Sequence, residues 1–288
     1  MKKIVRSPGS ATIVNAIATG YGSAFGINLD IIAKGRLKSS SKVKYSTDIN
    51  TDTTLIDLSI RKVLSYYGVE TGIDIKVESK LPQGSGLSSS SALSNSVVSL
   101  IANLVGEEFN LKPLTDDEII NLAIDASLKA GVSITGAYDD ATASYFGGIT
   151  VTNNIKREII FREEIDEYAI LIYIPDTVSL TKNSDVEKMR LLSPLVDVAF
   201  DLASNKEYFR ALTLNGFFYS TVLGFDTEIA LKALENGALA SGLSGTGSAF
   251  VAVSDNQNKD EIFDVWSSYP GKVIETQVDN VGTNLISK

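Results

Sequence analysis

A strand, a loop of glycine and serine residues, and a helix follow one another between residues 73 and 105, and this unit constrains the fold most strongly. Apolar and polar residues alternate from Ile73 to Glu78, which predicts a half-buried strand. Residues 81–92 read LPQGSGLSSSSA, and an apolar helical pattern continues to Val105. Small residues at a helix start let backbone amides surround an anion, which the helix dipole also attracts. The unit therefore predicts a phosphate-binding loop.

The loop differs from two common nucleotide-binding motifs. No Gly-x-x-x-x-Gly-Lys-Ser/Thr sequence occurs in the chain, so the loop is not a Walker A motif. Gly84-Ser85-Gly86 lacks the third glycine of a dinucleotide-binding fingerprint. A flexible Ser/Gly turn that only caps a helix is the alternative interpretation.

Further helices are expected on either side of this unit. Apolar residues recur at helical spacing over 55–67, and Gly68 ends that pattern. Thr115 and Glu118 have the spacing of a capping box, which predicts a helix that ends near Gly131. Glycines at 136, 147 and 148 then predict a loop that leads into another strand.

The second half of the chain alternates helical patterns with strands predicted at 168–175, 248–253 and 272–278. No long linker or internal repeat separates the halves. We therefore expect two closely packed domains, 1–160 and 161–288, that share a cleft.

The chain contains neither cysteine nor histidine. This excludes thiolate nucleophiles, disulfides, cysteine-based metal sites and histidine as a proton shuttle. The net charge of −9 argues against binding to nucleic acid or an anionic membrane. The amino terminus lacks the pattern of a secretory signal, and no apolar run is long enough to span a membrane, so a cytoplasmic location is expected. The oligomeric state is left open.

Residues 82–92 resemble the Pro-x-x-x-Gly-Leu-Gly-Ser-Ser-Ala loop of the GHMP kinases, the family of galactokinase, homoserine kinase, mevalonate kinase and phosphomevalonate kinase. Ser88 stands where that pattern has its second glycine. The resemblance implies that the loop binds the phosphates of ATP and that Ser90 contacts Mg²⁺. The residues predicted to bind nucleotide are Pro82, Gly84, Ser85, Gly86, Leu87, Ser88, Ser89 and Ser90.

Two other segments resemble the remaining motifs of this family. They are SPGSATIVN at residues 7–15 and SGLSGTGSA at residues 241–249. Several family members carry a lysine where this chain has Ser10, so the role of that lysine is not carried over. The resemblance implies a mixed α/β (α+β), two-domain GHMP kinase fold. Its amino-terminal domain is similar to ribosomal protein S5, and its carboxy-terminal α/β domain is ferredoxin-like.

Within the family, residues 9–20 and 136–141 look most like archaeal shikimate kinases. That resemblance implies ATP-dependent phosphorylation of the shikimate 3-hydroxyl, which gives shikimate 3-phosphate and ADP on the route to chorismate and the aromatic amino acids. The phosphate loop does not identify the acceptor, so homoserine or mevalonate are alternative substrates. A noncatalytic regulator that binds nucleotide or a metabolite is a third alternative.

The resemblance also implies site residues. Asp139 falls at the family's catalytic aspartate and is the predicted general base, whereas adjacent Asp140 is interpreted as structural. Asp125 or Ser127 is expected near the position of the family's magnesium-binding glutamate. The residues predicted to bind the acceptor are Asn15, Asp139, Lys182, Arg190, Gly245 and Thr246.

Overall fold

The computed structural model describes residues 2–39, 42–47, 53–176 and 185–287. Within these residues seven strands form one sheet in the order β11-β1-β2-β4-β3, and β5 extends it by pairing with β2 and β6. Only the pairing of β3 with β4 is parallel. The strands are β1 (Lys2–Val14), β2 (Tyr21–Lys38), β3 (Val43–Thr47), β4 (Gly72–Ser79), β5 (Ile149–Asn153), β6 (Glu158–Glu163) and β11 (Asn284–Ser287).

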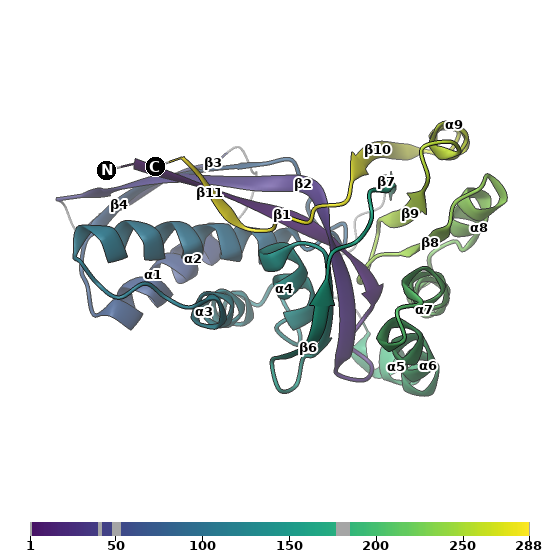
Figure 1. Cartoon of the computed structure of the whole chain (residues 1–288), viewed down its shortest axis with the longest axis horizontal. Coiled ribbons are helices and arrows are strands. Elements are labelled where there is room, and N and C mark those ends of the chain that lie inside the picture. The colour runs from purple at the N-terminus through teal and green to yellow at the C-terminus, as the bar shows by residue number, and fades with distance from the viewer. Residues whose placement is uncertain (1, 40–41, 48–52, 177–184, 288) are drawn as a thin grey trace.

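The long strand β2 joins the two parts of this sheet. Residues 31–38 pair with β4, whereas residues 21–25 pair with β5. In Figure 1, β1 and β2 run together from the chain termini to the junction with the second half of the molecule. The hairpin therefore carries the amino-terminal motif from the first sheet to that junction.

Three helices cover one face of the first sheet (Figure 1). They are α1 (Thr54–Tyr67), α2 (Ser89–Glu108) and α3 (Asp116–Lys129). Helix α2 lies between the sheet and the other two helices, so it is buried on most sides and its apolar residues do not form a single stripe. As predicted, Gly68 ends α1 in a left-handed conformation and Thr115 starts α3 with a complete capping box.

A fourth helix, α4 (Tyr138–Phe146), packs against β1, β2 and β5. The expectation of a loop between Gly136 and Gly147 is therefore wrong, because nine residues of that stretch are helical. Helix α4 begins after Ala137, which is left-handed with φ of 47° and makes no side-chain cap. A start of this kind leaves no capping signal in the sequence.

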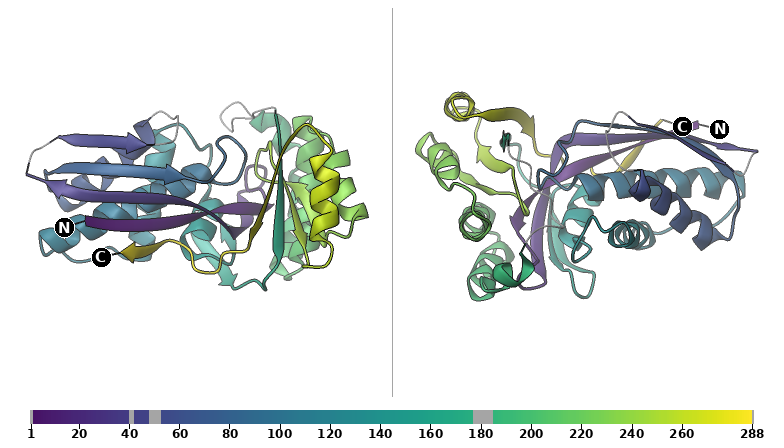
Figure 2. Two further views of the ribbon diagram at one scale, coloured as in Figure 1. Left: turned by 90° about the horizontal axis from the view of Figure 1, so that it is seen from above. Right: turned by 180° about the vertical axis from the view of Figure 1, so that it is seen from behind.

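The second half of the chain forms an antiparallel sheet of four strands among the described residues, in the order β10-β7-β9-β8. Its helices lie on one face of that sheet (Figure 2). The strands are β7 (Ala169–Pro175), β8 (Ala240–Leu243), β9 (Phe250–Ser254) and β10 (Gly271–Gln277). The helices are α5 (Val186–Arg190), α6 (Ser193–Ser204), α7 (Tyr208–Leu223), α8 (Glu228–Glu235) and α9 (Lys259–Ser267).

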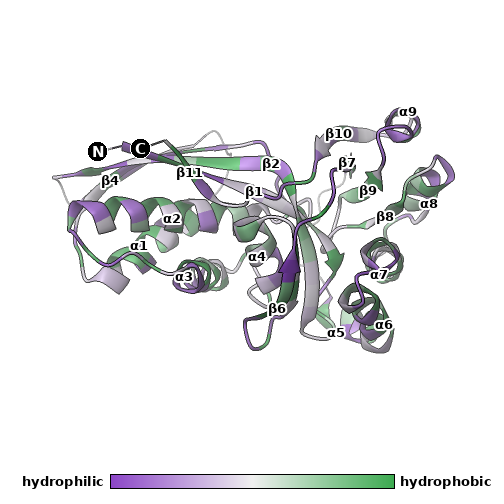
Figure 3. Cartoon of the chain, viewed as in Figure 1, coloured by the Kyte–Doolittle hydropathy of each residue, from purple (hydrophilic) through white to green (hydrophobic). Residues whose placement is uncertain are grey.

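Hydrophobic side chains fill the space between these layers. Figure 3 shows β9 in hydrophobic colours and the outer helix α9 in largely hydrophilic ones. Trp266, one of the two buried residues of α9, donates a hydrogen bond of 2.9 Å from its indole nitrogen to the carbonyl of Ile229. None of the helices in the described ranges combines the length and apolarity needed to span a membrane.

Strand β11 pairs with β1, so the two termini lie side by side in Figure 1. By pairing, β11 belongs to the first sheet, although it falls within the range 161–288 that was expected to form the second domain. Neither β11 nor the short strand β8 was expected from the sequence.

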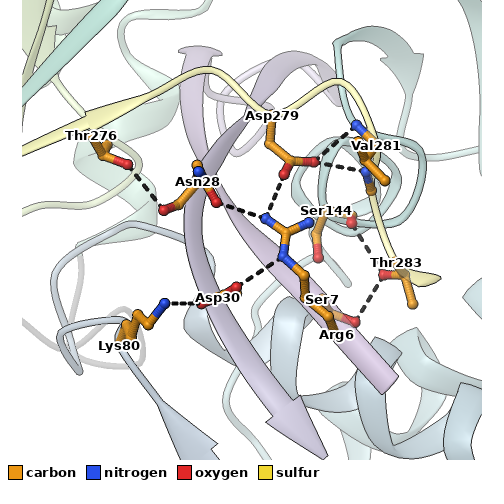
Figure 4. A network of polar contacts seen from close by, with 11 residues as sticks. Arg6, Ser7, Asn28, Asp30, Lys80, Ser144, Thr276, Asp279, Val281 and Thr283 are labelled. Carbon is orange, nitrogen blue, oxygen red and sulfur yellow. Dashed lines mark hydrogen bonds and ion pairs between the residues drawn. The ribbon is translucent and has the colours of Figure 1, made fainter. Parts of the chain in front are cut away.

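A partly buried arginine fixes this return of the chain (Figure 4). Arg6 on β1 donates hydrogen bonds of 2.8 Å to Asp30 on β2 and 2.5 Å to Asp279 before β11. Asp279 also accepts from the backbone amide of Gly282 at 2.7 Å, and its carbonyl accepts from Gly148 at 2.8 Å. The network thus connects both long strands with the segment that follows α4.

Candidate active site

A cavity of about 370 Å³ lies where the two halves of the chain meet. Its wall combines the end of β1, the loop before α2, the segment between α3 and α4, the first turn of α4, and the loop after β8. Of the residues predicted to bind nucleotide or acceptor, nine line this cavity: Asn15, Gly84, Gly86, Ser88, Ser89, Ser90, Asp139, Gly245 and Thr246.

The predicted phosphate loop has the backbone geometry of an anion-binding helix start. Gly84 and Gly86 have φ angles of 61° and 79°, and Ser88 before α2 is left-handed with φ of 58°. Glycine adopts this conformation at little cost, whereas serine rarely does. Ser88 thus keeps the conformation that the family's second glycine would adopt without strain.

The other loop residues support this surface from behind. Ser85 and Leu87 are buried, and the Ser85 hydroxyl donates a hydrogen bond of 2.8 Å to the carbonyl of Pro82. The carbonyl of Ser85 accepts from the amide of Ala249 at 2.9 Å. Pro82, Ser85 and Leu87 are absent from the residues that line the cavity, so these three shape the loop without facing the cavity.

The glycine-rich segment after β8 holds the phosphate loop in place. The Ser244 hydroxyl donates to the carbonyl of Gly86 at 2.8 Å and accepts from the amide of Thr12 at 3.1 Å. The Asn15 side chain donates to the carbonyl of Gly245 at 2.9 Å. The three motifs, far apart in the sequence, therefore meet in one place.

Ser10 occupies the position at which several family members carry a lysine. Its side chain is buried and donates a hydrogen bond of 2.6 Å to the Ser88 hydroxyl. The Asp140 carboxylate lies 3.5 Å from the same oxygen atom. Ser10 therefore joins β1 to the starts of both α2 and α4.

Asp139 lies in the first turn of α4 with only 5% of its surface exposed. The Asn154 amide donates a hydrogen bond of 2.7 Å to its Oδ1 atom. Gly22 on β2 leaves room for the carboxylate, because a Cβ there would lie 2.4 Å from Oδ2. Burial raises the pKa of Asp139, and the hydrogen bond from Asn154 opposes this shift. A carboxylate with a raised pKa is a stronger base once ionised.

Asp140 follows Asp139 but points to different partners. It lies against Ser10 and Ser88, whereas Asp139 contacts Asn154. Burial and the negative charge of Asp139 raise the pKa of Asp140 well above its usual range. Both carboxyl groups line the cavity, so they titrate as an interacting pair.

The two magnesium candidates from α3 occupy different environments. Asp125 forms ion pairs of 3.2 Å with Lys62 and 2.9 Å with Arg157, and it is not among the cavity residues. Ser127 lines the cavity and donates a hydrogen bond of 3.0 Å to the carbonyl of Ala123. Of these two alternatives, Ser127 therefore faces the cavity and Asp125 does not.

The cavity supplies oxygen atoms for a magnesium ion. No group of three or more acidic residues that could hold a metal by itself occurs within the described ranges. Magnesium that binds a nucleotide needs few protein ligands, because phosphate and water oxygens complete its coordination. The hydroxyls of Ser90 and Ser127 line the cavity, and these neutral oxygen donors fit such an ion.

Of the two cations predicted for an acidic acceptor, the one that the structure describes lies away from the cavity. Arg190 is exposed at the end of α5 and does not line it, so this prediction is wrong in position. Lys182 lies outside the described residues. Among the described residues that line the cavity there is no lysine or arginine.

Several cavity residues were not predicted from the sequence. Apolar side chains from β2, α1, α2 and the segment between α3 and α4 form one part of the wall, namely Ile31, Leu55, Leu93, Val132 and Ile134. Their pattern in the sequence predicts core residues at most, because an apolar residue that lines a cavity has the same sequence pattern as one in a core. Asn154 also carried no signal, since it simply follows a strand.

Comparison with known proteins agrees with this geometry. Residues 54–148 match the family described as GHMP kinases N terminal domain, and residues 192–272 match GHMP kinases C terminal. The chain is 55% identical to a shikimate kinase of Methanobrevibacter smithii, over 99% of this chain and 100% of the relative. It is 52% identical to a shikimate kinase of Methanothermobacter thermautotrophicus, over 99% of both chains.

Solved structures share the fold at much lower identity. The mevalonate kinase of Methanococcus jannaschii superposes with a TM-score of 0.77 at 15% identity, over 96% of this chain and 98% of that one. A homoserine kinase from Cytophaga hutchinsonii gives a TM-score of 0.72 at 19% identity, over 99% and 97%. These likenesses confirm the predicted two-domain α/β fold.

Proposed function

The chain belongs to the GHMP kinase family, and on that premise we propose that it is a shikimate kinase, which transfers the γ-phosphate of ATP to the shikimate 3-hydroxyl and releases ADP. The main support is the full-length identity of up to 55% to archaeal proteins named shikimate kinase. The observation that carries the chemistry is a phosphate loop and a buried carboxylate facing one cavity.

The wall of the cavity suits the parts of ATP. The start of α2 offers backbone amides and the hydroxyls of Ser89 and Ser90 to the phosphates. The apolar wall that includes Leu55 and Val132 suits a nucleobase, because an aromatic ring gains from removal of apolar surface from water. Gly84 and Gly86 let the backbone approach phosphate oxygens closely.

Asp139 is the proposed general base. The acceptor hydroxyl loses its proton to this carboxylate as its oxygen attacks the γ-phosphorus, and the bond from phosphorus to the leaving ADP oxygen breaks. Burial raises the pKa of Asp139, which favours uptake of that proton. Asn15, Gly245 and Thr246 are the proposed acceptor-binding residues, because they line the same cavity as Asp139.

Ser90 is the proposed protein ligand for Mg²⁺, with Ser127 as the neighbouring hydroxyl that also lines the cavity. When bound, Mg²⁺ supplies positive charge that neutralises the phosphates. This matters because the described cavity wall carries no lysine or arginine. The protein itself contributes neutral donors, namely backbone amides and serine hydroxyls, which orient the phosphates without adding charge.

A coupled assay of ADP release tests the function. The purified chain is incubated with ATP and Mg²⁺ and with shikimate, homoserine or mevalonate in turn. We expect ADP release that depends on shikimate and is negligible with the other acceptors. Release with homoserine or mevalonate alone would contradict the assigned acceptor. Nucleotide binding without acceptor-dependent release would instead support a noncatalytic regulator.

A further inference from the structure

A chain of hydrogen bonds leads from β5 to the carboxylate of Asp139. The Thr152 hydroxyl donates to Oδ1 of Asn154 at 2.7 Å, and Nδ2 of Asn154 donates to Oδ1 of Asp139 at 2.7 Å. The backbone of Asn154 is also held, because its amide donates to the carbonyl of Gly20 at 2.8 Å. All three polar side chains are at least nine-tenths buried. The arrangement is therefore rigid and shielded from water.

Thr152 determines which way the Asn154 amide points. Because the Thr152 hydroxyl donates to the amide oxygen, the amide NH₂ group faces Asp139. The same hydroxyl lies 3.2 Å from the carbonyl of Gly22, the residue that makes room for the Asp139 carboxylate. Thr152 thus contacts both Asn154 and Gly22, two of the residues next to this carboxylate.

Few charged groups surround Asp139. Its own helix contributes Asp140, and α7 contributes the buried hydroxyl of Tyr219, whose pKa is raised chiefly by burial and further by the charge of Asp139. On β2, Gly22 brings no side chain against the carboxylate. The described cavity wall includes no cation. The Asn154 amide is therefore the side-chain donor to this carboxylate.

We propose that Asn154, oriented by Thr152, is the positioning residue that holds the Asp139 carboxylate toward the acceptor hydroxyl. This inference rests on the proposed role of Asp139 as the base. A carboxylate on a short side chain can rotate about χ2, and one buried donor at 2.7 Å selects a single orientation. Misplacement of a catalytic group by about 1 Å can lower the rate about a hundredfold.

The donor also changes how Asp139 titrates. A hydrogen bond to the ionised form lowers a carboxylate pKa, so loss of Asn154 raises the pKa of Asp139 further. The base works only when it is ionised, so the acid limb of kcat/KM moves to higher pH in variants that lack the donor. A residue that only stabilises the fold would lower the melting temperature without moving this limb.

The test compares three variants. Asn154→Leu keeps the approximate size of the side chain but removes the donor. Thr152→Val keeps Asn154 but frees its amide to turn. Asn153→Ala is the matched control. Among the described residues, the side-chain oxygen of Asn153 accepts only from the backbone amide of Lys156, at 3.1 Å. Activity is measured as a function of pH, and ATP affinity is measured separately for each variant.

For Asn154→Leu we expect kcat at pH 7 to fall about a hundredfold, with little change in ATP affinity and with the acid limb at higher pH. Thr152→Val should also lower kcat and move the acid limb to higher pH, but by smaller amounts. Asn153→Ala should change neither kcat nor the acid limb. A folded Asn154→Leu variant with an unmoved acid limb would overturn the proposal. If that variant does not fold, an unmoved limb in Thr152→Val has the same meaning.

Failure of this inference differs from failure of the proposed function. If Asp139→Asn retains full activity, Asp139 is not the base and the proposed mechanism fails. If Asp139→Asn is inactive while the Asn154 and Thr152 variants keep the wild-type pH profile, only the positioning role fails.

Discussion

The hydroxyl of Ser10 donates a hydrogen bond of 2.6 Å to that of Ser88, and it joins the first strand to the left-handed residue that starts α2. Ser10 thus occupies the position of a family lysine without supplying its charge. The contact instead fixes the start of α2 against β1. Substitution of Ser88 can separate the effect of losing this hydrogen bond from the effect of the left-handed backbone.

Ser88→Gly and Ser88→Ala both remove the hydroxyl, but only glycine adopts φ of 58° without strain. We therefore expect Ser88→Gly to be more stable than Ser88→Ala by about 1–2 kcal/mol, the cost of a left-handed residue with a side chain. Urea unfolding of both variants measures this difference. Equal stabilities would mean that the loop relaxes to another conformation.

Asp139→Asn should lower kcat by about a hundredfold to ten-thousandfold, the usual contribution of a general base, while ATP affinity changes little. The wild-type rate should fall as pH decreases through the raised pKa of Asp139, because protonation removes the base. The matched control is Asp125→Asn, whose carboxylate is paired with Lys62 and Arg157 outside the cavity. Steady-state kinetics that show equal losses in both variants would contradict the assignment.

Asp140→Asn should stabilise the protein at neutral pH. The pKa of Asp140 is raised in the folded state by burial and by Asp139, so its ionisation opposes folding. Linkage gives the sign: the wild type loses stability as pH rises from the unfolded pKa of the carboxyl through the raised folded one. The variant should therefore gain free energy of unfolding at pH 7, and the gain should shrink toward pH 4. Urea unfolding at both pH values measures it, and a loss at pH 7 would contradict the prediction.

Local signals explain what could be predicted from the sequence. The helix start after the glycine-serine loop, the capping box at Thr115 and the helix end at Gly68 all depend on residues within a few positions of one another, and the structure confirms these local elements. Helix α4 was missed because its first turn follows left-handed Ala137 and has no capping side chain. Asp139 was predicted as the base from its place in the family's sequence pattern, and that prediction did not depend on the expected secondary structure.

Contacts between distant residues explain what could not be predicted. The hydrogen bond from Ser244 to Gly86 joins positions 158 residues apart, and the ion pair of Arg6 with Asp279 joins positions 273 apart. Neither spacing follows from helical or strand periodicity, because tertiary packing alone brings these groups together. The choice of Arg190 failed for the same reason: basic residues carry no local sign of the surface they face.

Arg6→Ala should cost about 3–5 kcal/mol of unfolding free energy, because it leaves the buried carboxylates of Asp30 and Asp279 without their shared partner. The matched control is Arg36→Ala, since Arg36 pairs with Asp74 at the surface and 57% of its side chain is exposed. Such a pair contributes about 0–1 kcal/mol. Chemical unfolding of both variants measures the costs. A cost for Arg6→Ala no larger than that for Arg36→Ala would show that the ion pairs of Arg6 with Asp30 and Asp279 contribute little to stability.

Gly86→Ala tests whether the phosphate loop depends on its contact with the segment after β8. A Cβ at this position would lie 2.2 Å from the carbonyl oxygen of Ser244, and the backbone has φ of 79°. Since a carbonyl cannot rotate away as a side chain can, the two loops must separate, which moves the amides that face the phosphates.

The control Gly68→Ala shares the left-handed backbone, with φ of 65°, but its Cβ would meet nothing within 4 Å. We expect Gly68→Ala to cost about 1–2 kcal/mol and to leave KM for ATP unchanged. Gly86→Ala should cost about 1–3 kcal/mol more and should also raise KM for ATP. Unfolding and steady-state kinetics of the two variants measure both effects, and an unchanged KM in Gly86→Ala would separate the loop contact from nucleotide binding.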